Sequence, residues 1–203
     1  MLGTRVSLEP LRRRHAGELF EAALQADESF AYMSYGPFAH RAEIDGFVAT
    51  HCAMPEAAFW AARPVTTGRA SGWLSLMNIE PGNAAIELGN IWFGPELSRT
   101  RAATEAMFLL LRHAADDLGY RRLVWKCNAL NEASRRAADR LGFTYEGTLR
   151  AHMLVKGRER DTAMYSITES EWPSRRDAML AWLAPENFDE HGNAIRSLAS
   201  FRT

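Results

Sequence analysis

Two arginines stand at the start of the strongest helical pattern in the chain. Arg99 and Arg101 belong to the run SRTRAA, which leads into a helix predicted over residues 101–118. The first turn of a helix offers backbone N–H groups and the positive end of the helix dipole, and guanidinium groups pair strongly with phosphates. The run is therefore compatible with a pyrophosphate site. A solvated pair of arginines at a helix start fits the same residues.

A second cluster lies further along the chain, where Asn131 and Ser134 are three residues apart at the predicted start of a shorter helix, residues 131–142. Asparagine is one of the preferred residues for capping a helix N-terminus. Capping is therefore the ordinary interpretation of Asn131. Ser134 falls inside the first turn of the helix, where a capping role fits it less well.

Glu87 is the third candidate, because it lies within a predicted strand among apolar neighbours, in the run AIELGN. Such a glutamate is either the partner of a cross-strand salt bridge or a buried carboxylate of raised pKa. A buried carboxylate of raised pKa is suited to accept a proton. The residue pattern alone leaves both interpretations open.

The elements that must position these residues change in kind along the chain. Strands are predicted at residues 5–11, 58–65, 70–80, 84–93, 121–127, 143–155 and 161–167. Helices are predicted at residues 15–25, 41–52, 101–118, 131–142 and 169–183. In the third helix the pattern places Leu118 on the apolar stripe and Glu105, Arg112 and Asp116 on the exposed face. A meander followed by strand–helix alternation indicates an α/β fold with one mixed sheet flanked by helices.

Length and composition limit the class of protein. The chain has 203 residues, 47% of them hydrophobic and 24% charged, which suits one ordinary globular domain. A formal net charge of −1 gives no support to a nucleic-acid partner or an anionic membrane. Cys52 and Cys127 cannot by themselves form a disulfide framework or a four-ligand zinc site, so no metal is predicted. Because no histidine is near Cys127 in the sequence, we expect a buried, unreactive thiol.

The start of the chain carries no recognisable cleavable leader, and no apolar run of eighteen residues occurs in the sequence. We therefore expect a soluble protein of the cytoplasm without a membrane partner. The predicted elements fill residues 1–184 as a single domain. Residues 185–203 are polar and are expected to be a C-terminal extension, in which Ile195, Leu198 and Phe201 are spaced three apart and could form a short docking helix.

Several motifs in order resemble those of the GNAT acetyltransferase superfamily, in its Rim-type branch of ribosomal-protein N-terminal acetyltransferases. They are WFGPE at 92–96, TEAM at 104–107, NEAS at 131–134, LGFTYEG at 141–147 and RDTAMYSI at 160–167. The family's pyrophosphate loop reads Gln or Arg, two residues, Gly, one residue, then Gly or Ala. Here Ser98 stands in the first position and Arg101 in place of the glycine, while Ala103 fits the last position.

The resemblance implies the GNAT fold, with a mixed central sheet of about seven strands. It implies acetyl-CoA as the co-substrate, no metal, and transfer of the acetyl group to an amine. Another acyl-CoA, such as a succinyl donor, stays open because of the extra arginines. The residues that the resemblance assigns to acetyl-CoA are Trp92, Phe93, Ser98, Arg99, Thr100, Arg101, Ala102, Ala103, Thr104, Asn131 and Ser134.

The resemblance also assigns chemical roles. Asn131 would hold the pantetheine arm, and Ser134 would donate a proton to the departing CoA thiolate as a general acid. Glu87 would act as the base, commonly through water, with Glu96 and His152 as competing candidates. A backbone N–H near the end of the Glu87 strand, at Trp92 or Phe93, would meet the oxyanion.

The acceptor is the least determined part of the prediction. The aromatic loop at residues 30–38 occupies the place where the family builds its acceptor groove, so Tyr32, Tyr35 and Phe38 are candidates for binding the substrate. An aromatic plug over the core fits them equally well. The expected acceptor is a primary amine, on a protein N-terminus or a small molecule, and a homodimer is left open. The competing hypothesis is a GNAT-shaped CoA-binding or regulatory module without turnover, because the loop glycine is missing.

Overall fold

The structure is a computed structural model that describes residues 1–24 and 26–202. Within them the strands form a seven-stranded sheet in the order β1-β2-β3-β4-β5-β7-β6, and the predicted α/β class with a mixed sheet is confirmed. The strands are β1 (Val6–Pro10), β2 (Ala58–Pro64), β3 (Gly72–Glu80), β4 (Ala85–Phe93), β5 (Arg122–Asn128), β6 (Thr144–Val155) and β7 (Arg158–Thr168). The α-helices are α1 (Ala16–Ala23), α2 (Arg41–His51), α3 (Arg101–Arg112), α4 (Glu132–Leu141) and α5 (Trp172–Leu183). Residue 25, the predicted end of the first helix, lies outside the described residues.

The chain folds as two compact units. Unit 1 holds Met1–Glu80 and Ile86–Leu111, and unit 2 holds Pro81–Ala85 and the chain from Arg112 onward. The predicted boundary between a domain at 1–184 and an extension at 185–203 stays a prediction. Each unit is described by itself below.

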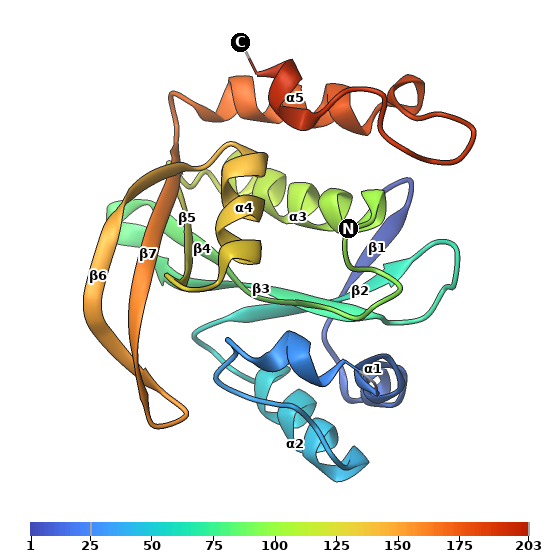
Figure 1. The fold of residues 1–203 in the computed structure, drawn as a ribbon, viewed down its shortest axis with the longest axis vertical. Helices are drawn as coiled ribbons and strands as arrows, with labels where there is room; N and C mark the ends of the chain where they lie inside the picture. Colours follow the sequence, from blue (N-terminus) through green and yellow to red (C-terminus); the bar gives the residue numbers. More distant parts are fainter. Residues whose placement is uncertain (25, 203) are drawn as a thin grey trace. The chain divides into compact units, whose positions relative to one another are not determined.

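In unit 1, β1, β2 and β3 form an antiparallel meander, with Val6 opposite Pro64 and Ala61 opposite Trp73. Helices α1 and α2 lie on one face of these strands and α3 on the other (Figure 1). The apolar stripes of α1 and α2 bury Leu19 and Ile44 in a core that is centred on aromatic rings. Burial of these stripes is what holds short amphipathic helices on a sheet.

Two expectations about α3 were wrong. Glu105 was placed on the exposed face, yet it is buried (6% exposed), because its carboxylate accepts hydrogen bonds from the backbone N–H groups of Thr4 (2.8 Å), Arg5 (2.7 Å) and Val6 (3.0 Å). Leu118 was placed on the apolar stripe, yet it is 50% exposed. After Arg112 the helix continues as a π-helix over His113–Asp117, and its wider turns shift every later side chain out of a 3.6-residue period.

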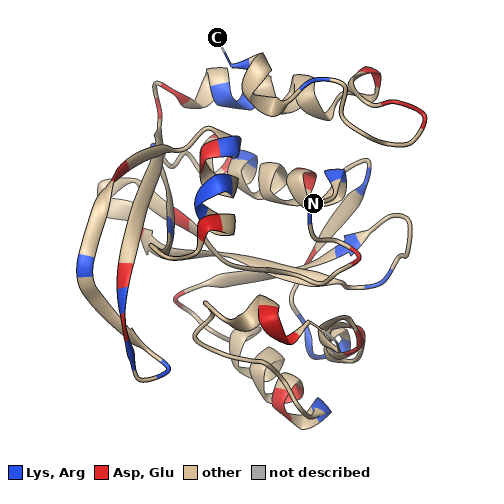
Figure 2. Ribbon diagram, viewed as in Figure 1, with Lys and Arg blue, Asp and Glu red and all other residues tan. Residues whose placement is uncertain are grey.

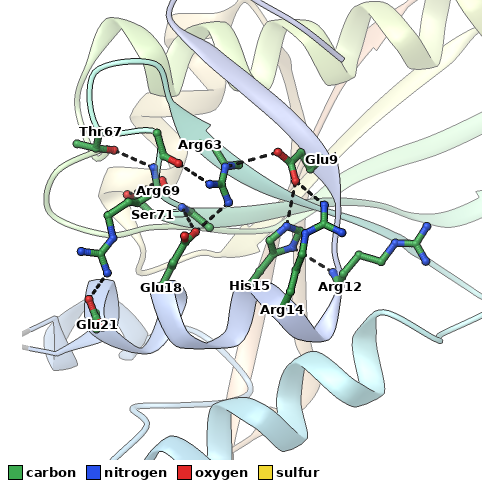
Figure 3. Close-up of polar contacts among 12 residues, drawn as sticks. Glu9, Arg12, Arg14, His15, Glu18, Glu21, Arg63, Thr67, Arg69 and Ser71 are labelled. Atoms are coloured by element: carbon green, nitrogen blue, oxygen red, sulfur yellow. Dashed lines mark hydrogen bonds and ion pairs between the residues drawn. The ribbon is translucent and has the colours of Figure 1, made fainter.

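Between α1 and the strands, a polar network ties β1 to the turn that follows it and to β2 (Figure 3). The Glu9 carboxylate accepts hydrogen bonds from Arg14 (2.7 Å) and from His15 Nε2 (3.1 Å), and Arg63 lies 3.5 Å from its other oxygen. The backbone N–H of Arg12 donates to His15 Nδ1 at 3.1 Å. That donor leaves His15 neutral, with its proton on Nε2, and burial lowers the pKa of His15 below its ordinary 6.5.

In unit 2, β5, β7 and β6 are antiparallel, with Trp125 opposite Tyr165. The connection between β6 and β7 was expected to span the five residues KGRER. It is shorter, because β7 begins at Arg158 and pairs it with Val155. Lys156 and Gly157 close the hairpin, both with positive φ, which is the geometry that two-residue hairpins favour.

The C-terminal residues of unit 2 contact its helices. Leu198, at the start of a 3₁₀ turn over Leu198–Phe201, is buried, while Ile195 is exposed. Arg202 donates to the carbonyl oxygen of Asp139 at 2.6 Å, near the last turn of α4. Cations are favoured at a helix C-terminus. The expected short helix with Ile195, Leu198 and Phe201 on one side is thus reduced to a 3₁₀ turn, in which Leu198 is the buried residue.

Basic and acidic residues are interspersed along the strands and helices of each unit (Figure 2). In the described part of the chain, no helix combines the length and apolar character that crossing a membrane requires. Among residues 1–24 and 26–202, no three His, Cys, Asp or Glu side chains gather as metal ligands would.

Candidate functional site

The middle of β4 is distorted by a residue in an unusual conformation. Asn90 has a positive φ of 49°, which is uncommon for a residue other than glycine and interrupts the regular strand. Its amide donates to Ser75 Oγ at 3.3 Å, and Ser75 in turn donates to the carbonyl oxygen of Gly89 at 3.0 Å. These bonds hold the distortion in place. An irregularity of this kind re-aims the backbone beyond it, at the strand end where an oxyanion donor is predicted.

The ring of Trp92 belongs to the core of unit 1, and a role for its backbone in binding acetyl-CoA stays a prediction. The ring is 2% exposed and stacks on Trp73 and Phe30, with centroids 4.4 and 5.1 Å away. Its indole N–H donates to Ser29 Oγ at 2.8 Å. Trp92 thereby fixes the 3₁₀ turn Asp27–Phe30 to the end of β4.

This end of β4 opens into a cavity of about 580 Å³. One wall comes from the turn that Trp92 holds, and the other from the end of β4 and the loop after it. The lining residues are Ala26, Asp27, Glu28, Ser29, Phe93, Pro95, Ser98 and Arg99. Three predicted acetyl-CoA residues, Phe93, Ser98 and Arg99, therefore meet at one cavity.

The loop before α3 is shaped by its own backbone. Thr100 caps the helix, because its hydroxyl accepts from the N–H of Ala103 at 3.1 Å and donates to the carbonyl oxygen of Leu97 at 2.7 Å. Arg99 adopts the left-handed conformation, with φ of 62°. Arg101, which replaces the family's glycine, is the first residue of α3 and is not among the described residues with positive φ. The replacement therefore costs no backbone strain.

The charges of this loop differ in their exposure. Arg99 is exposed at the cavity and Arg101 is half-buried. Because the Ala103 amide already has a partner in Thr100, a pyrophosphate would contact the turn that precedes it and the guanidinium of Arg99. Ala102 and Thr104 complete the first turn of α3, with Thr104 buried. The residues present are compatible with a pyrophosphate at this place.

Glu87 lies in β4 and is 5% exposed. Its Oε2 accepts a hydrogen bond from the side-chain amide of Asn78 in β3 at 2.7 Å, and its role as a base stays a prediction. The competing base Glu96 is exposed in the loop after β4. In unit 2, His152 is exposed on β6, with Nδ1 3.0 Å from Thr162 Oγ1.

The three aromatic residues of the predicted acceptor loop differ from one another. Tyr35 and Phe38 pack against the core of unit 1, and the Tyr35 hydroxyl accepts from the indole N–H of Trp73 at 3.1 Å. Burial raises the pKa of Tyr35 well above its ordinary value. Tyr32 is exposed. None of the three is among the residues that line the cavity, and their role in binding a substrate stays a prediction.

In unit 2, Asn131 caps α4 as the sequence indicates. Its Oδ1 accepts from the backbone N–H of Ser134 at 3.1 Å, and Gly142 ends the helix in the left-handed conformation, with φ of 92°. The Ser134 hydroxyl is half-buried and accepts from the indole N–H of Trp125 at 3.1 Å. Two hydrogen bonds therefore fix Ser134, one to its backbone and one to its side chain.

Sequence reasoning missed two parts of the candidate site. Asp27, Glu28 and Ser29 line the cavity, whereas the candidates for substrate binding named from the sequence are the aromatic residues that follow them. The run DES before the aromatic loop was the available signal, since exposed acidic residues beside a predicted acceptor groove can attract an amine. Trp125 is predicted only as a residue of a strand, and no local sequence pattern indicates its hydrogen bond to Ser134.

Comparison with known proteins gives the family. The acetyltransferase (GNAT) domain family matches residues 5–144, which is more than half of the chain. Among curated relatives, a protein of Bacillus subtilis (strain 168) named "Putative ribosomal N-acetyltransferase YdaF" is 30% identical over 109 residues, which are 54% of this chain and 59% of that protein. The chain thus spans less than two thirds of the length of this curated relative.

Solved structures of similar proteins share the fold of this chain. A GCN5-related N-acetyltransferase from Brucella melitensis is 45% identical, with a TM-score of 0.97 over 99% of this chain and 92% of that one. A probable acetyltransferase of the GNAT family from Chromobacterium violaceum ATCC 12472 is 40% identical, with a TM-score of 0.80 over 85% of this chain and 87% of that one. The fold and the sequence motifs thus agree, and the chain belongs to the GNAT acetyltransferase family.

Proposed function

We propose that this chain is an N-acetyltransferase that carries an acetyl group from acetyl-CoA to a primary amine, on a protein N-terminus or a small molecule. The observation that carries the proposal is the cavity at the end of β4. One wall presents Phe93, Ser98 and Arg99, and the opposite wall presents the carboxylates of Asp27 and Glu28. An anionic co-substrate suits the first wall, and a cationic acceptor suits the second.

The chemistry would proceed by direct attack within a ternary complex. The amine nitrogen bonds to the thioester carbonyl carbon, and the carbon–sulfur bond breaks to release CoA. Glu87 takes the amine proton through a water molecule, and Ser134 gives its hydroxyl proton to the departing sulfur and recovers one from solvent. A backbone N–H at the distorted end of β4 meets the developing oxyanion. The products are an acetylated amine and CoA.

The required base strength favours one class of acceptor. At pH 7, removing the proton from an α-amine of pKa about 8 costs about 1.4 kcal/mol, whereas a lysine of pKa about 10.4 costs about 4.6 kcal/mol. A single buried glutamate acting through water suits the first of these. We therefore place an α-amine, or another amine of low pKa, first among the acceptors.

The location and partners belong to the same proposal. Both cysteines are free thiols, which persist in reducing compartments, so a cytoplasmic location is included. A net charge of −1 gives no support to a nucleic-acid or membrane partner, so the only partner included is the amine acceptor.

The decisive experiment combines binding and turnover. The purified chain is heated with and without millimolar CoA and acetyl-CoA, and release of the CoA thiol is then followed with a panel of α-amines, lysine derivatives and short peptides. Ligand binding to the folded state raises the unfolding temperature. We expect protection by both ligands and thiol release that depends on the amine. Absence of protection at millimolar CoA would exclude the assignment.

The competing function, a CoA-binding module without turnover, was motivated by the missing loop glycine. Because Arg101 is helical and unstrained, that motivation is weaker than the sequence suggests. Protection by CoA without thiol release across the whole panel would support the module instead.

A further inference from the structure

Two buried residues of β5, Trp125 and Cys127, belong to the strand that contacts the helix carrying Ser134. Both residues lie on β5, two apart, so their side chains leave the same face of the strand, and both are buried. Helix α4 packs against β5. Trp125 Nε1 lies 3.1 Å from Ser134 Oγ.

The direction of these bonds follows from the chemistry of the partners. An indole N–H can only donate, so at Trp125 the Ser134 oxygen must be the acceptor. The proton of the Ser134 hydroxyl then points away from Trp125 and is left for another acceptor. Burial raises the pKa of the Cys127 thiol on the same face of β5, so that thiol stays neutral.

A donor on a hydroxyl oxygen has a second effect. It stabilises the negative charge that the oxygen acquires when the proton leaves, and so makes the hydroxyl a better proton donor. The ring of Trp125 is itself held by packing, with the ring of Phe143 5.6 Å away, so that the N–H is fixed in place. Trp125 therefore can orient Ser134 and favour the loss of its proton.

We propose that Trp125 is a positioning residue for the general acid: its indole N–H turns the Ser134 hydroxyl towards the departing CoA sulfur and supports the proton transfer. This inference rests on the proposed function. The bond that breaks is Ser134 Oγ–H, and the bond that forms is S–H on CoA.

The test is a double-mutant cycle on the full-length chain. Trp125→Phe keeps the ring and removes the donor, and Ser134→Ala removes the acid. We expect Trp125→Phe to lower kcat about three- to tenfold, the range for one hydrogen bond, with KM for acetyl-CoA unchanged. In the Ser134→Ala background the same change should alter kcat less than about twofold, because there is no hydroxyl left to orient.

A matched control comes from a second buried tryptophan in unit 2. The indole N–H of Trp172 donates to Asp116 Oδ1 at 2.6 Å, so Trp172→Phe also removes a donor from a buried ring. We expect it to lower the unfolding temperature and to leave kcat near that of the unmodified chain. If Trp125→Phe instead lowers kcat equally in both backgrounds, its role is structural and the inference is wrong.

The inference and the proposed function can fail separately. An enzyme that acetylates amines, loses activity in Ser134→Ala and keeps full kcat in Trp125→Phe contradicts the inference alone. The inference is also overturned if Ser134→Ala is fully active, because Trp125 then has no acid to position. A chain that neither binds CoA nor releases its thiol contradicts the proposed function itself.

Discussion

In α4, two side chains hold Ser134 in place. Asn131 accepts a hydrogen bond from its backbone N–H and Trp125 donates one to its hydroxyl, each at 3.1 Å. In the loop before α3 the shape comes from the chain itself, through the left-handed Arg99 and the cap that Thr100 provides. The first region keeps the family's motif, whereas the second departs from it. A site that depends on individual side chains tolerates fewer replacements than one whose geometry lies in the backbone.

The largest expected effect is at the region held by side chains. Ser134→Ala should lower kcat about a hundredfold, the lower end of general-acid contributions, with the dissociation constant of CoA near normal. Steady-state kinetics and a binding titration measure the two quantities. An unchanged kcat would show that Ser134 is not the general acid, and the comparison between α4 and the loop before α3 would then have no catalytic meaning.

Next in size is the buried carboxylate of β4. Glu87→Gln keeps the bond with Asn78 within reach and removes the base, so we expect kcat to fall about tenfold at pH 7. The deficit should shrink as the pH rises towards 9, because an α-amine then loses its proton without help. It should also be larger with lysine-like acceptors.

Glu105→Gln is the matched control for this change, since Glu105 is a buried carboxylate of the same unit that lies in α3. Its bonds to the backbone of β1 predict lower stability with kcat retained. Loss of kcat in both variants to the same degree would mean that burial, and not base catalysis, explains the result.

A smaller effect is expected at the region shaped by the backbone. Arg99→Ala should raise KM for acetyl-CoA about fivefold and leave KM for the amine unchanged, because only the charged contact is lost and the loop geometry remains. Asp27→Asn, on the opposite wall of the cavity, should do the reverse. Kinetics with each substrate varied in turn test both. A collapse of all activity in Arg99→Ala would show that the loop depends on this side chain after all.

The smallest effect concerns stability alone. Because the pKa of His15 is lowered in the folded state, the unfolded chain binds a proton more readily, and stability is lost as the pH falls below about 6.5. The slope is at most about 1.4 kcal/mol for each pH unit, since one proton is involved. His15→Gln should flatten the stability profile between pH 7 and 5, measured by urea unfolding.

The hydrogen bond from Arg14 lowers the pKa of Glu9 below its ordinary value of 4.5, so Glu9 affects stability mainly below the range of pH 7 to 5. Parallel stability profiles of the unmodified and His15→Gln chains would show that another group controls the pH dependence. His15→Gln should leave kcat unchanged, because no residue of the network around His15 is one to which we assign chemistry.

Local signals allowed much of this molecule to be predicted. Asn131 and Gly142 mark the two ends of helix α4 in the sequence. Period-two alternation predicts the bounds of β2 to within one residue. The π-helix after Arg112 was not predictable, because the same residues fit an uninterrupted helix. Contacts between distant residues were also hidden, as with Glu105, whose apparent place on a polar face conceals its bonds to β1.

The candidate site follows the same division. Residues within one motif, such as Arg99 and Ser134, could be named from the sequence. Trp125 could not be, because its hydrogen bond joins it to a residue on another element. The run DES was a signal for Asp27, but its place at the cavity depends on residues far along the chain. Periodicity indicates which side of a helix or strand is buried, but it does not indicate which residues of other elements that side contacts.

The contrast between the two cysteines has a practical consequence for any assay that detects liberated CoA with a thiol reagent. Cys52 is exposed, whereas Cys127 is buried beside Ser134 with its pKa raised, and thiolates are the reactive form. The folded protein should therefore titrate rapidly as a single sulfhydryl per chain, and denaturant should reveal the second. Replacing Cys52 by serine would give a background-free enzyme in which every rapid colour change belongs to turnover.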